Sequence, residues 1–245
     1  VEAELKRCGV ELVLGVRVES IEPGLKVNYA SAKDGAKGAA EGDVVLMAGG
    51  RAPNTRGIGL EKLGVRMDRK GFVDVDGLCR TNVPGVYAIG DINGKMQLAH
   101  VASAQGLLVA DHIAGKPCKQ LNYNRIPSCV YCNPETAMVG LTEEQARATG
   151  REIGTGTFSL SGNGKALTMG ENKGFAKFVF DKATDEILGF HVIGPRATDL
   201  AAEVAAVMEC EGTVAEIGRT VHPHPTVSEA VMEAAHVCHG SCVNA

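Results

Sequence analysis

Three consecutive segments decide the fold of the second half of the chain: Gly174-Phe-Ala-Lys-Phe-Val-Phe180, Asp181-Lys-Ala-Thr-Asp-Glu186 and Ile187-Leu-Gly-Phe-His-Val-Ile193. The first and third are rich in aromatic and β-branched residues, which favour strands, and the polar segment between them supplies a turn. They predict two strands joined by a turn, and a further strand is expected at Thr155–Leu160.

Helices are expected after these strands, at Ala197–Glu211, Thr213–Gly218 and Val227–His239. A strand-like stretch at Ile126–Tyr131 and a helix with Thr142 as its N-cap precede them. Strands first and helices afterwards indicate an α+β domain with an antiparallel sheet and helices on one face. We assign this domain to residues 123–245.

The first 50 residues are typical of the end of an α/β domain. We expect a short helix at Val1–Cys8, strands at Glu11–Ile21 and Leu25–Ala30, and, after a Gly/Ala/Lys loop, a buried strand at Val44–Ala48. The partner elements of so short a helix would have to lie upstream. Residues 1–50 are therefore interpreted as an α/β fragment.

The composition excludes several classes of function. The 245 residues are 44% hydrophobic and 22% charged, and the net charge of −4 leaves no basic stripe for nucleic acid. No stretch approaches the ~20 apolar residues that span a bilayer, and no signal peptide is visible, although the chain starts at Val1 without a Met. Eight irregularly spaced cysteines, Cys129-x-x-Cys132 among them, are typical of reduced thiols in an intracellular protein.

A middle block, residues 51–122, contains the string Thr81-Asn-Val-Pro-Gly-Val-Tyr-Ala-Ile-Gly-Asp91. A short strand at Val86–Ile89 that ends in Gly90-Asp91 would put a carboxylate at a sheet edge, where it can bind the hydroxyls of a dinucleotide. The helix expected at Leu98–Ile113 would direct its N-terminal dipole at an anionic group such as a reduced flavin. The alternative is a plain turn in which the aspartate caps the approach to a helix.

Two glycines, Gly49 and Gly50, follow the strand expected at Val44–Ala48. Glycine at a strand end lets the backbone lie against a nucleotide, although an ordinary interdomain turn explains the pair equally well. The phosphate-binding pattern G-x-G-x-x-G is absent, because Gly57-x-Gly59 followed by Gly64 has the wrong spacing.

The third string that carries chemistry is Val221-His-Pro-His-Pro-Thr-Val-Ser-Glu229. The two prolines stiffen the segment and fix the direction of His224, and Glu229 follows on a helix. An imidazole held by a carboxylate is the usual general acid/base near neutral pH. We therefore predict that His224 and Glu229 are catalytic, with His222 as the next candidate.

These strings, in this order, resemble the pyridine nucleotide-disulfide oxidoreductases of class I, and the histidine string is most similar to the dihydrolipoamide dehydrogenases among them. The resemblance covers essentially the whole chain. It implies that Gly90 and Asp91 bind FAD, that Leu98, Ala99 and His100 lie near the flavin ring, and that Gly49 and Gly50 border NAD. It also implies a homodimer in which His224 of one subunit serves the active site of the other, with the lipoyl domain of a multienzyme complex as partner.

The resemblance divides the chain into the end of an NAD domain (residues 1–50), a central domain that completes the flavin site (51–122) and an interface domain (123–245). The family's redox-active Cys-x4-Cys pair and nucleotide-binding glycines are missing, and Ala52 and Pro223 stand where Arg and Ala are common. We therefore expect a C-terminal fragment of an enzyme that oxidises dihydrolipoamide with NAD+. Alone, it should be inactive and should retain no cofactor.

Other interpretations stay open. The parent could be a glutathione- or mercuric-type reductase, or the chain could act only as a dimerisation module. A metal site at His236, Cys238, His239 and Cys242 is a weaker alternative, and we predict no metal. The location should be the mitochondrial matrix if the protein is eukaryotic, and otherwise the cytoplasm.

The helix expected at Ala197–Glu211 carries an apolar stripe that bears on the expected dimer. Leu200, Val204, Val207 and Met208 recur at helical spacing, and neighbouring alanines widen this apolar stripe. The stripe predicts a contact between subunits, unless it is buried against the chain's own sheet.

Overall fold

A computed structural model describes residues 1–244, which form two compact units, residues 1–52 and residues 53–244. Within the described residues no helix is long and apolar enough to cross a membrane.

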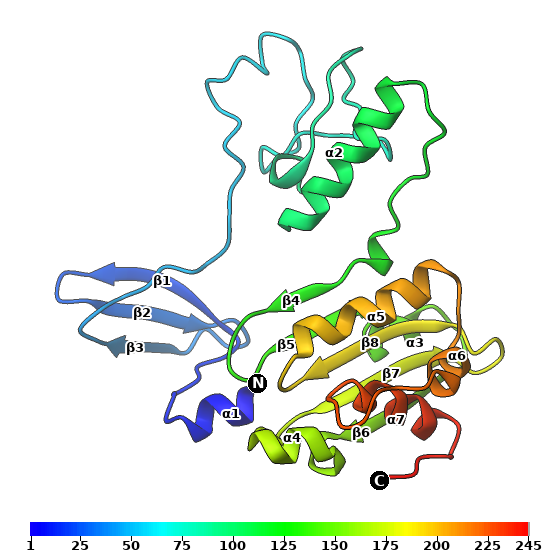
Figure 1. Ribbon diagram of the computed structural model, residues 1–245. Coiled ribbons are helices and arrows are strands. Elements are labelled where there is room, and N and C mark those ends of the chain that lie inside the picture. The colour runs from blue at the N-terminus through cyan, green and yellow to red at the C-terminus, as the bar shows by residue number, and fades with distance from the viewer. Residues whose placement is uncertain (245) are drawn as a thin grey trace. The chain divides into compact units, whose positions relative to one another are not determined.

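The unit Val1–Ala52 contains helix α1 (Glu2–Arg7) and an antiparallel sheet of β1 (Val16–Glu22), β2 (Lys26–Ser31) and β3 (Lys37–Glu41), in the order β1-β2-β3 (Figure 1). The helix and the first two strands were expected from the sequence. The third strand was expected to be a loop. It forms because Lys37 to Glu41 pair in register with β2, so that the ladder satisfies backbone groups whatever the side chains are.

The buried strand expected at Val44–Ala48 is wrong. The segment has no regular structure, and Val44 and Leu46 are 83% and 85% exposed. An apolar run becomes a buried strand only where another strand supplies backbone partners and a core covers its side chains. None of the strands described for residues 1–52 pairs with this run.

The part of the second unit up to Asn122 is built mainly from turns around a small core. Val65, Val73, Val75 and Ala88 pack together in it. The strand expected at Val86–Ile89 is wrong in extent, because only the single bridge Arg80↔Tyr87 forms. Helix α2 (Ala99–Ile113) follows, as predicted.

The remainder of this unit is an antiparallel sheet with helices, which confirms the predicted α+β fold. Its five strands lie in the order β4-β5-β8-β7-β6. They are β4 (Ser128–Val130), β5 (Thr136–Gly140), β6 (Ile153–Ser159), β7 (Phe175–Asp181) and β8 (Ile187–Ile193). The strand β5 was not expected, and the turn between β7 and β8 lies where the sequence predicted it.

Helices α5 (Ala197–Glu209), α6 (Val214–Arg219) and α7 (Glu229–Cys238) follow the last strand of this sheet (Figure 1). Residues of all three helices share one core with Phe178 and Phe190 of the sheet. Helix α3 (Glu143–Ala148) packs through Ala146 against the alternate strand residues Val179 and Leu188, which face the other side of the sheet. The predicted N-cap Thr142 forms a capping box with Gln145. Helix α4 (Gly164–Met169) was not expected.

The apolar stripe of α5 is satisfied within the chain. Leu200, Val204 and Met208 are 7%, 0% and 6% exposed, and all three belong to the core beneath the sheet. The chain's own sheet covers these three side chains, so their spacing gives no evidence for a subunit contact, and the place of that contact stays a prediction.

Candidate active site

The segment between α6 and α7 carries the histidine for which the sequence predicts an acid/base role. Nδ1 of His224 lies 2.9 Å from Oε1 of Glu229, the first residue of α7. An ionised carboxylate only accepts hydrogen bonds, so Nδ1 carries a proton, and in the neutral imidazole Nε2 is the nitrogen with the free lone pair. The side chain of His224 is 76% exposed and that of Glu229 only 19%. Glu229 therefore holds the imidazole from the protein side, and Nε2 of His224 faces outward.

Glu229 is itself held by the turn that precedes it. The N–H of Thr226 donates to Oε2 of Glu229 over 2.8 Å, and the hydroxyl of Thr226 donates to the carbonyl of Pro223 over 2.7 Å. Burial on its own would raise the pKa of Glu229, but the hydrogen bonds from Thr226 and His224 outweigh burial and lower it. Glu229 is thus an anion near neutral pH, as the orientation of an imidazole requires.

Asn163 supports the same turn from another part of the chain, and the sequence analysis did not single it out. It is 3% exposed, caps α4 by accepting from the N–H of Ala166, and donates from Nδ2 to the carbonyl of Thr226 over 3.0 Å. Asparagine before a helix is a readable N-cap signal, but its second contact lies 63 residues away along the chain.

His222 forms a second pair with a glutamate. Its Nε2 lies 2.8 Å from Oε1 of Glu203 on α5, and its Nδ1 lies 2.9 Å from the carbonyl of Thr220. The side chain of His222 is 4% exposed, so the two histidines of the string differ sharply in burial. The hydrogen bond to Glu203 raises the pKa of His222, against the opposing effect of its burial.

The predicted flavin-binding turn is a short 3-10 helix, Gly90–Asn93. Gly90 has φ +72°, and a Cβ there would come within 3.2 Å of the Cβ of Ala102, so both the conformation and the packing favour glycine. Asp91 is exposed at the beginning of this turn.

A buried polar network that the sequence analysis missed holds this turn. Oε1 of Gln105 accepts from the N–H of Gly90 over 2.6 Å and from Nδ2 of Asn93 over 3.0 Å, while its Nε2 donates to the Tyr123 hydroxyl over 2.9 Å. Gln105 is fully buried on α2. A lone glutamine among the small residues of that helix was the available signal.

The next three predicted residues lie at the beginning of α2. Leu98 is the N-cap, in an extended conformation, and the cap makes no side-chain hydrogen bond. Ala99 and His100 are exposed in the first turn, and Nε2 of His100 lies 2.9 Å from the carbonyl of Pro127. The N-terminal end of this 15-residue helix, where the helix dipole is positive, therefore has no side-chain cap. It follows the turn that carries Asp91 by a few residues.

Gly49 and Gly50 lie in an exposed stretch without regular structure. A Cβ at either position would meet nothing within 4 Å, so no close approach of protein atoms requires glycine there. Gly50 has φ +115°, which does favour glycine for conformational reasons.

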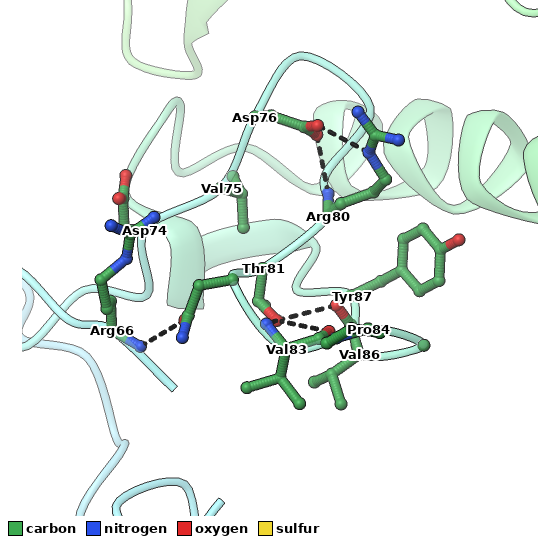
Figure 2. A pocket seen from close by; sticks show the side chains of 12 residues that line it. Arg66, Asp74, Val75, Asp76, Arg80, Thr81, Val83, Pro84, Val86 and Tyr87 are labelled. Carbon is green, nitrogen blue, oxygen red and sulfur yellow. Dashed lines mark hydrogen bonds and ion pairs between the residues drawn. The ribbon is translucent and has the colours of Figure 1, made fainter. Parts of the chain in front are cut away.

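The residues Thr81 to Tyr87 line a pocket of about 540 Å³, together with Arg66, Asp74 and Asp76 among others. Figure 2 shows Arg80 directed to Asp76 across one end, and the Thr81 hydroxyl turned back toward the backbone of Val83 and Val86. The pocket combines two arginines with two aspartates and contains no cysteine or histidine. It therefore holds neither a thiol nor an imidazole.

Comparison with known proteins identifies the family. A model described as pyridine nucleotide-disulphide oxidoreductase matches residues 1–106, and the dimerisation-domain model of the same family matches residues 126–235. The chain belongs to the pyridine nucleotide-disulphide oxidoreductases.

Relatives in this family are similar in sequence over nearly the whole chain. The dihydrolipoyl dehydrogenase of Thermus scotoductus is 42% identical over 98% of this chain, and that of Cupriavidus necator is 43% identical over 96%. The chain covers 52% and 50% of these two relatives, so it spans about half the length of the curated proteins it matches.

Two solved structures share the fold of this chain. LpdA of Mycobacterium tuberculosis superposes with a TM-score of 0.84 at 30% identity, covering 96% of this chain and 51% of that one. The HOCl-induced flavoprotein disulfide reductase RclA of Escherichia coli superposes with a TM-score of 0.82 at 26% identity, covering 94% and 52%.

Three of the cysteines are directed to separate backbone carbonyls. Cys129 is directed to the carbonyl of Thr198 and Cys132 to that of Pro134, and burial raises the pKa of Cys129. At the C-terminal end, Cys238 is directed to the carbonyl of Ala234, and burial raises its pKa to about 12. In residues 1–244 no three His, Cys, Asp or Glu side chains gather as metal ligands, so the alternative site at His236, Cys238, His239 and Cys242 is not assembled.

Proposed function

We propose that this chain is the C-terminal half of a flavin-dependent, NAD-linked dihydrolipoamide dehydrogenase, in which His224 is the acid/base and Glu229 orients it. The observation that carries the proposal is the hydrogen bond between Nδ1 of His224 and the carboxylate of Glu229. It leaves Nε2 as the basic nitrogen, on a side chain that is exposed. The dihydrolipoyl dehydrogenases among the relatives support the substrate class.

The proposed reaction is the oxidation of dihydrolipoamide by NAD+ to give lipoamide, NADH and a proton. Nε2 of His224 would take a proton from one thiol of the substrate and so raise the fraction of the attacking thiolate. The disulfide that receives the electrons would be supplied by residues outside this chain, because the chain contains no Cys-x4-Cys. FAD, when bound, would relay the electron pair.

The residues from Gly90 to the beginning of α2 fit a role in holding FAD. Asp91 lies exposed on a turn that a buried glutamine fixes, and α2 begins without a side-chain cap. We propose that Gly90 and Asp91 bind the ribityl or ribose part and that Leu98, Ala99 and His100 lie beside the ring. Gly49 and Gly50 have no comparable support in their surroundings, so their proposed border with NAD rests on the family alone and no step is derived through it.

The remaining parts of the proposal follow the family. Residues 1–50 would complete an NAD domain, 51–122 the flavin site and 123–245 a dimer interface, in an intracellular homodimer that serves a lipoyl domain. The match to a dimerisation domain over residues 126–235 supports the dimer. The exposure of His224, which the chain's own residues do not cover, supports a role in the partner's active site.

The test is His224→Gln in the complete enzyme. Loss of a general base should lower the turnover of dihydrolipoamide by about 10²–10⁴-fold and leave the visible flavin spectrum unchanged. A steady-state NADH assay measures the first and an absorption scan the second. Turnover within threefold of wild type, with flavin bound, would remove His224 from the mechanism.

A further inference from the structure

The segment that presents His224 is held almost entirely by side chains. Within the described part of the chain, no backbone–backbone hydrogen bond involves residues 221–226. Pro223 and Pro225 have no N–H to donate, and Val221 is 92% exposed. The position of His224 therefore depends on the side-chain anchors at the two ends of the segment.

One anchor lies after His224, where Glu229 and Asn163 bind Thr226. The other lies before His224 and consists of His222 alone. His222 is two residues from His224, and its side chain is the buried one, at 4% exposure against 76% for His224. Its contacts connect the segment to Glu203 of α5 and to the end of α6 at Thr220.

Both ring nitrogens of His222 face acceptors. The carbonyl of Thr220 cannot donate, so Nδ1 of His222 must carry a proton, and the carboxylate of Glu203 requires a second proton on Nε2. Both contacts therefore favour the protonated imidazole, and the negative charge of Glu229 also raises the pKa of His222, after the hydrogen bond to Glu203. The side chain of Glu203 is 32% exposed, but that of His222 is only 4% exposed, so loss of Glu203 would leave a nearly buried imidazole without its partner.

We propose that the Glu203–His222 ion pair is a positioning element that fixes the direction of His224, the acid/base of the proposed function on which this inference rests. His222 is thereby a positioning residue and Glu203 its anchor on the rigid helix α5. The sequence pattern His-Pro-His-Pro then has two unlike histidines. The first is buried, paired with a glutamate and holds the segment, and the second is the exposed base.

The test compares His222→Gln and Glu203→Gln with a matched control, His239→Gln. His239 also forms a histidine–carboxylate pair of 2.8 Å, with Asp185, but at the far end of α7. In the complete enzyme, loss of either member of the Glu203–His222 pair should lower kcat by about 10–100-fold, as expected for misplacement of a catalytic group. KM should change by less than about threefold, and the control should match wild type.

A second measurement reads His224 directly in this chain. A two-bond ¹H–¹⁵N spectrum at mildly alkaline pH reports which ring nitrogen is protonated. Wild type should show Nδ1–H on His224, and both variants of the pair should show a mixture of tautomers, because the bond to Glu229 is no longer enforced. A thermal melt of each variant separates this local effect from unfolding, and Glu203→Gln keeps the test valid if His222→Gln fails to fold.

The two proposals fail in different ways. If His224→Gln leaves turnover intact, the acid/base assignment falls, while the tautomer spectrum still decides whether the pair positions His224. If His224→Gln abolishes turnover but folded His222→Gln and Glu203→Gln keep normal kcat and a single Nδ1–H tautomer, the positioning role is overturned and the acid/base role stands.

Discussion

The two units of this chain differ in how much of their apolar surface they bury. In Val1–Ala52 a single residue, Ala30, is buried, and six of the seven residues of β1 are exposed. In the other unit, β7 has five buried residues out of seven, and Phe178 and Phe190 are fully buried with ring centroids 4.8 Å apart. The same kind of strand is therefore supported by backbone pairing in one unit and by a core in the other. This contrast predicts that equivalent substitutions in the two units will have unequal effects.

The largest expected difference comes from placing a charge in each unit. Val204→Glu puts a carboxylate where the native side chain is fully buried in an apolar core. It should cost more than about 4 kcal/mol and prevent stable folding of the sheet. Leu46→Glu, at a position 85% exposed, should change stability by less than about 0.5 kcal/mol. Circular dichroism melts compare the two.

A cooperative melt of Val204→Glu near the wild-type temperature would break the comparison. This variant cannot be used to test the dimer, because Val204 lies in the core and not on the surface. Loss of dimer mass in this variant would consequently report unfolding and would say nothing about the subunit contact.

A smaller difference is expected when side chains are shortened. Phe178→Ala should lower the free energy of unfolding by about 3–5 kcal/mol, because it removes half of an aromatic pair and leaves a cavity. Ile21→Ala on β1, where the side chain is 41% exposed, should cost less than about 1 kcal/mol. Urea unfolding gives the free energies, and hydrogen exchange by mass spectrometry assigns each loss to its unit. Equal losses would mean that β1 is covered as well as β7 is.

The comparison also explains which parts of the fold the sequence could predict. One core within the chain covers the strands β7 and β8 and the helices α5 to α7. Their residue patterns predicted these elements within a few residues. The run Val44–Ala48 has the same apolar pattern without a pairing strand among the described elements, and the prediction failed there. Strand β3 was missed for the opposite reason, since backbone pairing alone holds its Gly and Ala residues.

The candidate site divides in a similar way. His224 and Glu229 lie five residues apart, so a local pattern was enough to pair them. Glu203 and Asn163 reach the same segment from 19 and 63 residues away, and only the fold brings them there. A glutamate within the apolar run of α5 was a signal that something polar faces it, but the sequence does not name the partner.

The smallest difference concerns ion pairs, and it can be followed by pH. Lys177 of β7 and Glu143 of α3 lie 2.5 Å apart with side chains 26% and 35% exposed, whereas Lys26 and Glu41 in the other unit lie 3.7 Å apart with exposures of 42% and 72%. The hydrogen bond from Lys177, followed by that from Arg147, lowers the pKa of Glu143 from 4.5 to about 2. Because the folded-state pKa is depressed, the stabilisation is complete above pH 4.5 and is lost as the pH falls through about 2.

Lys177→Met should therefore lower Tm by about 1–3 °C at pH 7, and the difference from wild type should shrink steadily between pH 4.5 and 2. Lys26→Met should leave Tm unchanged at every pH, because a long, exposed pair is screened by solvent. Arg147 still contacts Glu143 in the first variant, so part of the stabilisation of that carboxylate is retained. Scanning calorimetry across this pH range decides the matter. A pH-independent loss in Lys177→Met would assign the effect to packing of the lysine stem, and a loss in Lys26→Met of the same size would remove the contrast between the two units.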